Sequence, residues 1–332
     1  MSVQTMTKTD TGDAEATLAQ IKQAAAAGAD LVRVALPNAR VLDSFQQICA
    51  ASPLPVVADV HFDYRLAVEA AKRGAAKLRI NPGNLGGRDR LAAVLEAAGR
   101  AGIPVRVGVN AGSLPQDLLA RHGGPTAEAM AEAAQRMVAE AQELGFCDLV
   151  VSLKASDVPR TVQANRLFAA ETDLPLHLGV TEAGLGQEAV VRSAVGIGTL
   201  LAEGIGDTIR VSLTGEPAEE VRAGRQILQA LGMLPGPVLV ACPTCGRCRV
   251  DLRPIVEEVR AALESVSEPL VVAVMGCEVN GPGEAKHADV GLAAGANSVA
   301  LFRHGEIVRR VPIGEAAQAL LAELDALRRA PA

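Results

Sequence analysis

The sequence predicts an α/β protein built as a (βα)8 TIM barrel followed by a smaller α+β domain. Eight short β-branched runs alternate with longer, Ala-rich stretches, and the alternation stops near residue 234. Such alternation builds a parallel sheet with helices outside it, and eight units favour a closed barrel over the alternative, an open doubly wound sheet. The expected strands are Ser2–Met6, Leu31–Leu36, Val56–Val60, Lys77–Ile80, Val105–Val109, Leu149–Leu153, Leu176–Val180 and Thr208–Leu213.

Each expected strand is followed by a segment that can form a helix, for example Glu15–Ala27, Thr126–Leu144 and Pro217–Leu231. The Leu-Pro-Gly-Pro turn at 234–237 then breaks the pattern, because Pro and Gly interrupt both helices and strands. We therefore expect a barrel domain over residues 1–234 and a second domain over residues 235–332. The second domain should contain strands at Val238–Ala241 and Leu270–Val274, a helix near Pro254–Leu263, two short strands and a final helix at Gly314–Arg328.

Composition and charge exclude several classes of partner. The 332-residue chain has a net charge of −6, only 2% aromatic residues and no Trp, so it offers neither a basic footprint for duplex nucleic acid nor a platform for stacking bases. No apolar stretch approaches the ~18 residues that indicate a membrane span. The first residues show no basic region followed by an apolar run, so no export signal is visible. We expect a cytoplasmic protein without nucleic-acid or membrane partners.

Polar residues occupy positions in the predicted barrel strands that are normally apolar. Most come in pairs spaced by two or four residues, so both side chains of a pair point to the same side of the sheet. Near the carboxyl ends of barrel strands, such residues line the mouth where active sites are built. Arg33 stands alone on the second strand, and His177 lies at the start of the seventh. The pairs are Asp59 and His61, Arg79 and Asn81, Arg106 and Asn110, Ser152 and Lys154, and Arg210 and Ser212.

The cations at this mouth are Arg33, Arg79, Arg106, Lys154 and Arg210. Each alone could be a strand-end charge in solvent or half of an internal ion pair. Together they repel one another unless anions compensate, and Asp59 and Glu182 can offset only part of the charge. A polyanionic ligand, most simply a diphosphate, would supply the rest. Glycine-containing loops at 81–84, 110–113 and 181–184 would let backbone amides approach a phosphate.

Four of the six cysteines gather in the last third of the chain, as expected for a metal site in a reducing compartment. Cys242 and Cys245 form a C-x2-C pair at the end of a predicted strand, and Cys277 follows the next strand. With Cys248 they would make a four-thiolate site, suited to zinc or to an all-cysteine iron–sulfur cluster. With Glu284 instead, one iron would have an exchangeable oxygen ligand and could bind a substrate oxygen directly. The spacing leaves both ligand sets open.

Sequence motifs spread over almost the whole chain carry a resemblance to a known family. They lie at 2–11, 58–65, 78–84, 108–113, 154–157, 177–184 and 203–213. The most specific are Ala-Cys-Pro-Thr-Cys-Gly-Arg at 241–247 and Gly-Cys-Glu-Val-Asn-Gly-Pro-Gly-Glu-Ala at 276–285. In these segments the chain resembles the bacterial, two-domain 4-hydroxy-3-methylbut-2-enyl diphosphate synthases of the methylerythritol phosphate pathway.

The resemblance implies an activity, a cofactor and an assembly. Enzymes of this family reduce 2-C-methyl-D-erythritol 2,4-cyclodiphosphate with two electrons and open its ring with loss of water. Their [4Fe-4S] cluster is held by three cysteines and a glutamate, which correspond here to Cys242, Cys245, Cys277 and Glu284 and leave Cys248 as a bystander. Ferredoxin or flavodoxin donates the electrons. The family works as a head-to-tail homodimer in which each cluster domain covers the partner's barrel.

The resemblance and the predicted mouth together suggest roles for the remaining residues. Glu182, with His61 as its partner, is the candidate for proton delivery to the departing hydroxyl. Glu284 is also expected to be catalytic, because a carboxylate can give up its place on iron to a substrate oxygen. The expected substrate-binding residues are Arg33, Asp59, Arg79, Asn81, Arg106, Asn110, Lys154, Arg210 and Ser212.

The chain departs from the family pattern in two places. Lys8 lies in the first βα loop where the family often has Asn, so it would alter a substrate contact or add a cation to the mouth. Family members usually have a short segment before the first strand, on which this chain almost begins.

Two other functions compete with this interpretation. A pterin-dependent transferase would also bind a diphosphate ester at a barrel mouth, but it would leave the cysteines unexplained. A zinc-stabilised binding module would be colourless and hold one zinc per chain.

Overall fold

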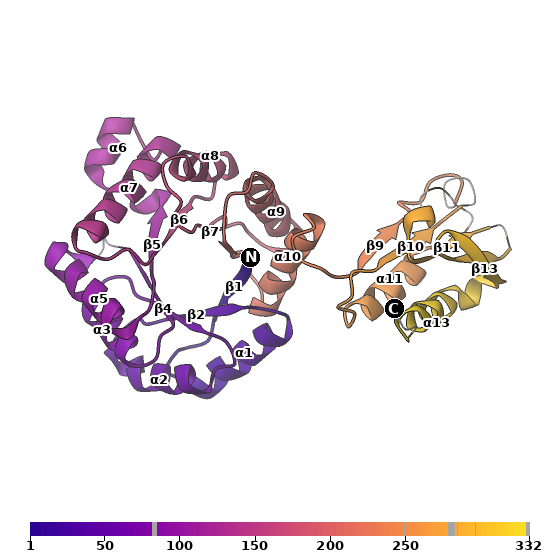
Figure 1. Cartoon of the computed structure of the whole chain (residues 1–332), viewed down its shortest axis with the longest axis horizontal. Coiled ribbons are helices and arrows are strands. Elements are labelled where there is room, and N and C mark those ends of the chain that lie inside the picture. Colours follow the sequence, from indigo (N-terminus) through magenta and orange to yellow (C-terminus); the bar gives the residue numbers. More distant parts are fainter. Residues whose placement is uncertain (82–84, 249, 278–282, 284, 296, 330–332) are drawn as a thin grey trace. The chain divides into compact units, whose positions relative to one another are not determined.

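Figure 1 shows the chain as a computed structural model that describes residues 1–329, apart from 82–84, 249, 278–282, 284 and 296. Its contacts divide it into two compact units, Met1–Met233 and Leu234–Ala332. Each unit is a continuous piece of chain with its own sheet. Within the described residues, no helix combines the length and the apolar character needed to cross a membrane.

The first unit is a barrel of eight parallel strands surrounded by helices (Figure 1). Its strands follow the order β6-β5-β4-β3-β2-β1-β8-β7, and a parallel bridge between Val151 and Leu176 joins β6 to the start of β7. The TIM-barrel prediction is confirmed, and the open doubly wound alternative is wrong. The strands are β1 Ser2–Met6, β2 Leu31–Ala35, β3 Val56–Asp59, β4 Lys77–Ile80, β5 Val105–Asn110, β6 Leu149–Lys154, β7 His177–Leu178 and β8 Thr208–Ile209.

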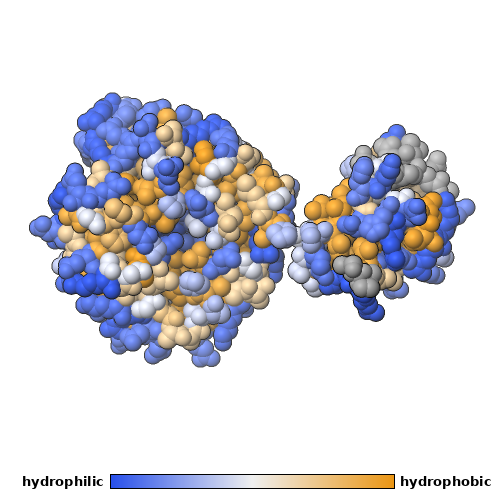
Figure 2. Space-filling model, viewed as in Figure 1, coloured by the Kyte–Doolittle hydropathy of each residue, from blue (hydrophilic) through white to orange (hydrophobic). Residues whose placement is uncertain are grey.

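Four of the barrel helices begin at a side chain that caps them, and the barrel helices bury one apolar side. Asp13, Asp63, Thr126 and Asp157 each accept a hydrogen bond from a backbone N–H in the first turn. The outward rim of the barrel is largely hydrophilic (Figure 2). The helices are α1 Ala14–Ala26, α2 Leu42–Ala51, α3 Tyr64–Lys72, α5 Arg88–Ala101, α6 Gln116–His122, α7 Ala127–Glu143, α8 Val158–Ala169, α9 Gly186–Ala202 and α10 Pro217–Ala230.

The last two barrel strands are shorter than the sequence predicts. The ladder between β7 and β8 ends at Leu178 and Ile209, although the pattern of β-branched residues continues beyond both. At Gly179 a Cβ atom would lie 2.6 Å from the carbonyl oxygen of Arg210 and 2.8 Å from Lys154 Nζ. Only glycine therefore fits at position 179, because a Cβ atom would collide with the Arg210 backbone and the Lys154 side chain.

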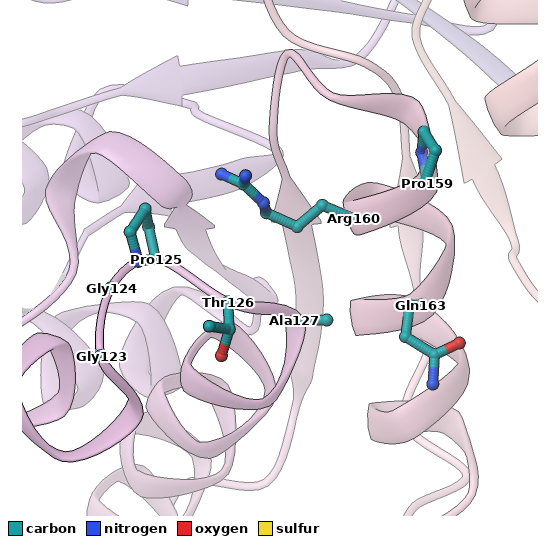
Figure 3. Close-up of a pocket in the computed structure, with 8 residues that line it drawn as sticks. All are labelled: Gly123, Gly124, Pro125, Thr126, Ala127, Pro159, Arg160 and Gln163. Atoms are coloured by element: carbon teal, nitrogen blue, oxygen red, sulfur yellow. The ribbon is translucent and has the colours of Figure 1, made fainter.

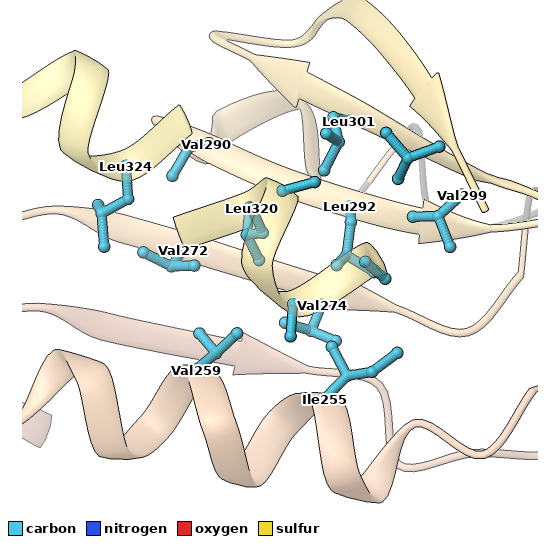
Figure 4. Close-up of a cluster of buried hydrophobic side chains, with 14 of the residues drawn as sticks. Ile255, Val259, Val272, Val274, Val290, Leu292, Val299, Leu301, Leu320 and Leu324 are labelled. Carbon is cyan, nitrogen blue, oxygen red and sulfur yellow. The ribbon is translucent and has the colours of Figure 1, made fainter. Parts of the chain in front are cut away.

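The second unit is a five-stranded sheet with two helices on one face. Strands β9, β10 and β11 are parallel, whereas β12 and β13 are antiparallel additions at one edge. Figure 4 shows Val259 of one helix and Leu320 of the other packed against Val274 and Leu292 of the sheet. The elements are β9 Val238–Ala241, α11 Arg253–Leu263, β10 Val271–Met275, β11 Val290–Ala294, β12 Val299–Arg303, β13 Glu306–Val311 and α13 Ala316–Arg329.

Candidate active site

Strand register places Asp59, Arg79 and Arg106 side by side inside the barrel, with Lys154 nearer the carboxyl end of its strand. Asp59 of β3 is paired with Arg79 of β4, and Arg79 is paired with Arg106 of β5. Asn110 at the end of β5 is paired in the same way with Lys154 of β6. Arg79, Arg106 and Lys154 are only 6%, 2% and 8% exposed. Long charged side chains are rarely buried so deeply unless they have partners, so this burial requires compensation.

Asp59 is one source of that compensation. Its carboxylate lies 3.1 Å from Arg79 Nη1 and 3.8 Å from Arg33 Nε. The ring of His61, which is 42% exposed, places Nε2 3.4 Å from the carboxylate of Asp59 and 2.6 Å from Arg79 Nη1. Burial by itself would raise the pKa of Asp59, but Arg33, the hydrogen bond with His61 and Arg79 together hold that pKa well below its usual range.

The electrostatics of the cations show an excess of positive charge. Burial lowers the pKa of Arg33 to about 10, although Asp59 opposes the shift. Burial, followed by repulsion from Arg106 and Arg33, lowers the pKa of Lys154 well below its usual value. Burial also lowers the pKa of His177 well below its usual value, with Arg106 as the next cause, so this imidazole is neutral at pH 7. Each of these shifts would be relieved by an anion bound among the cations.

A second buried carboxylate, which the sequence analysis missed, belongs to Glu220 on α10. It is 1% exposed and forms an ion pair with Arg210, at 3.1 Å between Oε1 and Nη2. Glu182, which was expected with Asp59 to offset part of the charge, is exposed in the loop after β7. The signal for Glu220 was its helical spacing from Pro217, Val221 and Gly224, which places an acid on the buried side of α10.

The other predicted site residues lie in the loops at the mouth. Asn81 donates a hydrogen bond from Nδ2 to Ser113 Oγ at 3.2 Å, and Ser113 donates to the Asn110 carbonyl oxygen at 3.3 Å. Ser212 is half-buried just beyond β8. Glu182 has a left-handed backbone with φ 54, a strained state for a residue other than glycine. Such strain is concentrated at functional sites.

Several buried polar atoms in the barrel lack a partner among the described residues. Gln4 accepts from Arg106 Nη1 at 3.3 Å, but the Nε2 atom of the same Gln4 has no partner. The same is true of Arg106 Nε, Asn81 Oδ1 and His177 Nε2. Buried polar groups in proteins are normally satisfied by protein, water or ligand. These atoms and the uncompensated cations together fit a barrel interior that receives a polar, anionic ligand.

Two of the predicted cluster ligands, Cys242 and Cys277, lie at the carboxyl edge of the second sheet. Cys242 directly follows β9 and donates its backbone N–H to the Val274 carbonyl oxygen of β10 at 2.9 Å. Cys277 lies just beyond the end of the same β10, so the two cysteines share this edge. Cys242 and Cys277 are half-buried and Cys245 is exposed. Glu284 lies outside the described residues, and among those described no three His, Cys, Asp or Glu side chains stand in the geometry of a metal site.

Two local features distinguish the residues of the C-x2-C turn from Cys248. Thr244, between Cys242 and Cys245, has a left-handed backbone with φ 59, which is rare for a β-branched residue. Cys248, which like Cys242 packs against the hydrophobic core, donates its thiol to the Val250 carbonyl oxygen at 3.2 Å. Its sulfur also lies 2.6 Å from where a Cβ on Gly276 would be. This hydrogen bond within the domain gives Cys248 a structural partner that needs no metal.

A separate pocket lies on the outside of the barrel, between the first turns of α7 and α8 (Figure 3). Arg160 extends across it towards Pro125. None of the predicted site residues lines this pocket. The uncompensated cations and the buried polar atoms without partners therefore indicate the candidate site, whereas this pocket does not.

Comparison with known proteins identifies the family. The family model described as the GcpE TIM-barrel domain matches residues 1–225, and the model of the GcpE protein C-terminal domain matches residues 238–326. The chain belongs to the GcpE family. It is 53% identical to a Geobacter sulfurreducens relative, over 98% of this chain and 92% of that protein, and 51% identical to a Thermodesulfovibrio yellowstonii relative, over 97% and 93%. Both relatives are named 4-hydroxy-3-methylbut-2-en-1-yl diphosphate synthase (flavodoxin).

Solved structures show a more distant likeness of fold. A dihydropteroate synthase from Yersinia pestis covers 70% of this chain and 93% of its own, with a TM-score of 0.50 and 15% identity. The synthase from Coxiella burnetii covers 70% and 92%, with a TM-score of 0.51 and 14% identity. At such low identity the likeness shows the barrel fold alone, so it gives no support to the pterin-dependent alternative.

Proposed function

We propose that the barrel mouth of this GcpE family member binds 2-C-methyl-D-erythritol 2,4-cyclodiphosphate and that the chain converts it to 4-hydroxy-3-methylbut-2-enyl diphosphate. The reaction is a two-electron reductive ring opening with loss of water, and the chain is therefore an oxidoreductase of isoprenoid precursor synthesis. The observation that carries this proposal is the excess of buried cations in the barrel. The chain is also about half identical, over nearly its full length, to synthases of this product.

The buried cations act as a clamp for the two phosphate groups. Arg106 and Lys154 would bind phosphate oxygens, because both are buried and neither has a carboxylate within ion-pair distance among the described residues. Arg33 and Arg79 share Asp59, which keeps their side chains ordered before the ligand arrives. When the ring C–O bond breaks, charge grows on the leaving phosphate, and a preformed array of cations stabilises that charge. The remaining contacts are assigned to Asn81, Asn110, Arg210 and Ser212.

Proton delivery to the departing hydroxyl is assigned to Glu182, with His61 as its partner. The strained backbone of Glu182 is consistent with a residue held in place for chemistry. His61 combines partial exposure with contacts to Asp59 and Arg79, so its ring is fixed while one side stays open to the mouth. A general acid must come within hydrogen-bond reach of the oxygen that it protonates.

A [4Fe-4S] cluster fits the donor set at the edge of the second sheet. Cys242 and Cys277 follow adjacent parallel strands, and a strained turn links Cys242 to Cys245. Thiolates are the ligands that iron–sulfur clusters use, and Glu284 is proposed as the fourth ligand. When bound, the cluster would supply the two electrons one at a time. The hydrogen bond of the Cys248 thiol to the Val250 carbonyl oxygen supports its role as a bystander.

The names of the relatives favour flavodoxin over ferredoxin as the electron donor. We assign the chain to a head-to-tail homodimer in which each cluster domain serves the partner's barrel.

The experiment that tests the function is anaerobic purification followed by iron, sulfide and zinc analysis and an assay with the cyclic diphosphate and reduced flavodoxin. The proposal expects a brown protein with about four irons per chain that forms 4-hydroxy-3-methylbut-2-enyl diphosphate. A colourless protein with one zinc per chain and no turnover would establish the zinc-stabilised binding module instead.

A further inference from the structure

Glu220 of α10 is a buried acid that the function proposed above does not use. We propose that Glu220 is a positioning residue: with Lys8 and Thr5 it fixes Arg210 in the orientation in which that guanidinium receives a phosphate of the cyclic diphosphate. This inference rests on the proposed function of the mouth. It extends that function to a residue that never touches the substrate.

The contact between Glu220 and Arg210 is side-on and uses two nitrogen atoms. Arg210 Nε donates to Glu220 Oε2 at 3.3 Å, and Arg210 Nη2 donates to Oε1 at 3.1 Å. A guanidinium has five N–H groups in one plane, so this grip leaves the Nη1 side available to a ligand. Two parallel hydrogen bonds also fix the plane of the group, which a single ion pair would not do.

Glu220 is itself held from two other parts of the barrel. Thr5 of β1 donates its hydroxyl to Oε2 at 2.8 Å, and the backbone N–H of Leu213 donates to Oε1 at 3.4 Å. The ammonium of Lys8, in the loop after β1, lies 3.3 Å from Oε1. Because both oxygens are occupied by several partners in a buried place, the carboxylate cannot rotate without breaking hydrogen bonds. The Arg210 guanidinium is therefore held in one orientation.

Lys8 completes this arrangement as a strap, because its side chain ties the loop after β8 to Glu220. Its ammonium donates to the carbonyl oxygens of Leu213, at 3.0 Å, and of Gly215, in the loop between β8 and α10. An ammonium has three N–H groups, and these two carbonyls with Glu220 account for all three. Of the two alternatives that the sequence left open for Lys8, the contacts support neither a substrate ligand nor a free cation at the mouth. Lys8 secures the loop that carries Arg210 and Ser212.

Glu220 compensates part of the buried positive charge, but for ligand binding its charge alone is unfavourable. A carboxylate near an anion site repels the ligand, and it also cancels part of the positive charge that attracts the ligand. Burying it is costly as well unless it is fully hydrogen-bonded. A benefit that offsets both costs is the orientation of Arg210, because a correctly placed bidentate donor binds phosphate better than a mobile one.

The test compares two isosteric changes in the holoenzyme. Glu220→Gln keeps the volume, but its amide group meets the N–H groups of Arg210. Glu203→Gln is the matched control, because Glu203 grips Arg166 through the same Nε and Nη2 atoms on the exposed outside of the barrel. Glu220→Gln should raise KM for the cyclic diphosphate roughly 10-fold or more and change kcat only a few-fold. Its affinity for inorganic pyrophosphate, measured by calorimetry, should fall by a similar factor, while iron content stays unchanged. Glu203→Gln should match the wild type.

Two further variants separate position from charge. Glu220→Asp keeps the charge but is too short for the same grip, so it should stay impaired; wild-type KM in Glu220→Asp would overturn the positioning role. Lys8→Met should raise KM less than Arg210→Ala does, because a strap has been lost rather than a ligand contact. An equal rise would make Lys8 a substrate ligand and overturn the strap.

The outcomes distinguish this inference from the function on which it rests. If the wild type binds pyrophosphate and turns over the cyclic diphosphate but Glu220→Gln has wild-type KM and affinity, the positioning role is wrong and the function stands. If the wild type does neither, the proposed function itself fails. Should Glu220→Gln not fold, Arg210→Lys tests the pair from its other side, because an ammonium cannot make both bonds. Unchanged KM in Arg210→Lys would overturn the proposal.

Discussion

The barrel mouth and the cysteine edge of the second sheet are prepared for their ligands to different degrees. In the mouth, Arg79 and Arg106 project from paired strands, are at most 6% exposed and have positions set by register. At the cysteine edge the thiols lie just beyond the strands, Cys245 is exposed, and the described side chains form no metal geometry. Barrel strands position the residues of the anion site. At the thiolate site, the ends of two strands position only Cys242 and Cys277.

This difference has a physical origin. Barrel strands are held by ladders on both sides, so their side chains stay aligned even when like charges repel. Residues in loops have no such support, and metal binding and local folding are coupled wherever the ligands are carried by loops. We therefore expect the mouth to keep its ligand affinity without the cluster, and the cysteine edge to take its ligand geometry when the cluster binds.

The largest effect should come from Cys277→Ser. This variant should lose nearly all iron and reduce activity by about 10³-fold or more, because a serine hydroxyl is a poor ligand for iron–sulfur clusters. Its affinity for pyrophosphate, measured by calorimetry, should stay close to wild type if the mouth is independent of the cluster. Cys147→Ser, at an exposed cysteine of the barrel, is the matched control and should keep both iron and activity. A loss of pyrophosphate affinity in Cys277→Ser would break the comparison.

The next effect separates the two possible ligand sets. Glu284→Gln should keep some cluster but lose most turnover, because a neutral amide is a poor ligand for iron. Cys248→Ser should keep its iron and most activity, since the Cys248 thiol already bonds to the Val250 carbonyl. Iron analysis and steady-state rates measure both. Loss of the cluster in Cys248→Ser with a silent Glu284→Gln would identify an all-cysteine site.

A smaller effect is expected from Arg106→Ala in the mouth. Removing a buried cation that faces the ligand should raise KM for the cyclic diphosphate roughly 100-fold, and the visible spectrum of the cluster should not change. Arg100→Ala, on the exposed side of α5, is the control and should have wild-type kinetics. Unaltered kinetics in Arg106→Ala would show that this arginine is structural.

Mixing two inactive chains tests whether mouth and cluster come from different subunits. Lys154→Ala has a defective mouth and Cys277→Ser a defective cluster. In a head-to-tail dimer, a mixed pair contains one composite site with both parts intact, so a random mixture should recover roughly a quarter of wild-type activity. No recovery, in a sample where mass spectrometry finds mixed dimers, would show that each chain builds its site alone.

The smallest effect concerns acid stability and follows from Asp59. Its folded-state pKa is held below the unfolded value, so the ion pairs with Arg33 and Arg79 stabilise the fold above about pH 4 and are lost as pH falls below that value. Asp59→Asn should be roughly 3 kcal/mol less stable at pH 7, and the difference from wild type should shrink below pH 4. Urea unfolding at both pH values measures this. A constant difference would mean that Asp59 stabilises through shape rather than charge.

How far the sequence reaches can be judged element by element. The first six barrel strands were placed to within a residue, because their β-branched runs end close to where the ladders end. The seventh and eighth strands were predicted too long, because β-branched residues continue beyond the point where their ladder ends. Asp59 was assigned correctly as a partner of the cations, whereas Glu220 was missed because its role depends on how α10 packs against β1.

The sequence by itself determined the alternation of strands and helices, the polar positions that face the inside of the barrel, and the cysteines at the ends of two strands. These follow from periodicity and spacing, which are local properties of the chain. Only the tertiary structure decided which acid balances which cation. It also decided that Lys8 binds the loop after β8 and that Cys248 packs against a hydrophobic core. Such pairings depend on barrel closure and on distances between residues up to about 200 positions apart, which no local pattern contains.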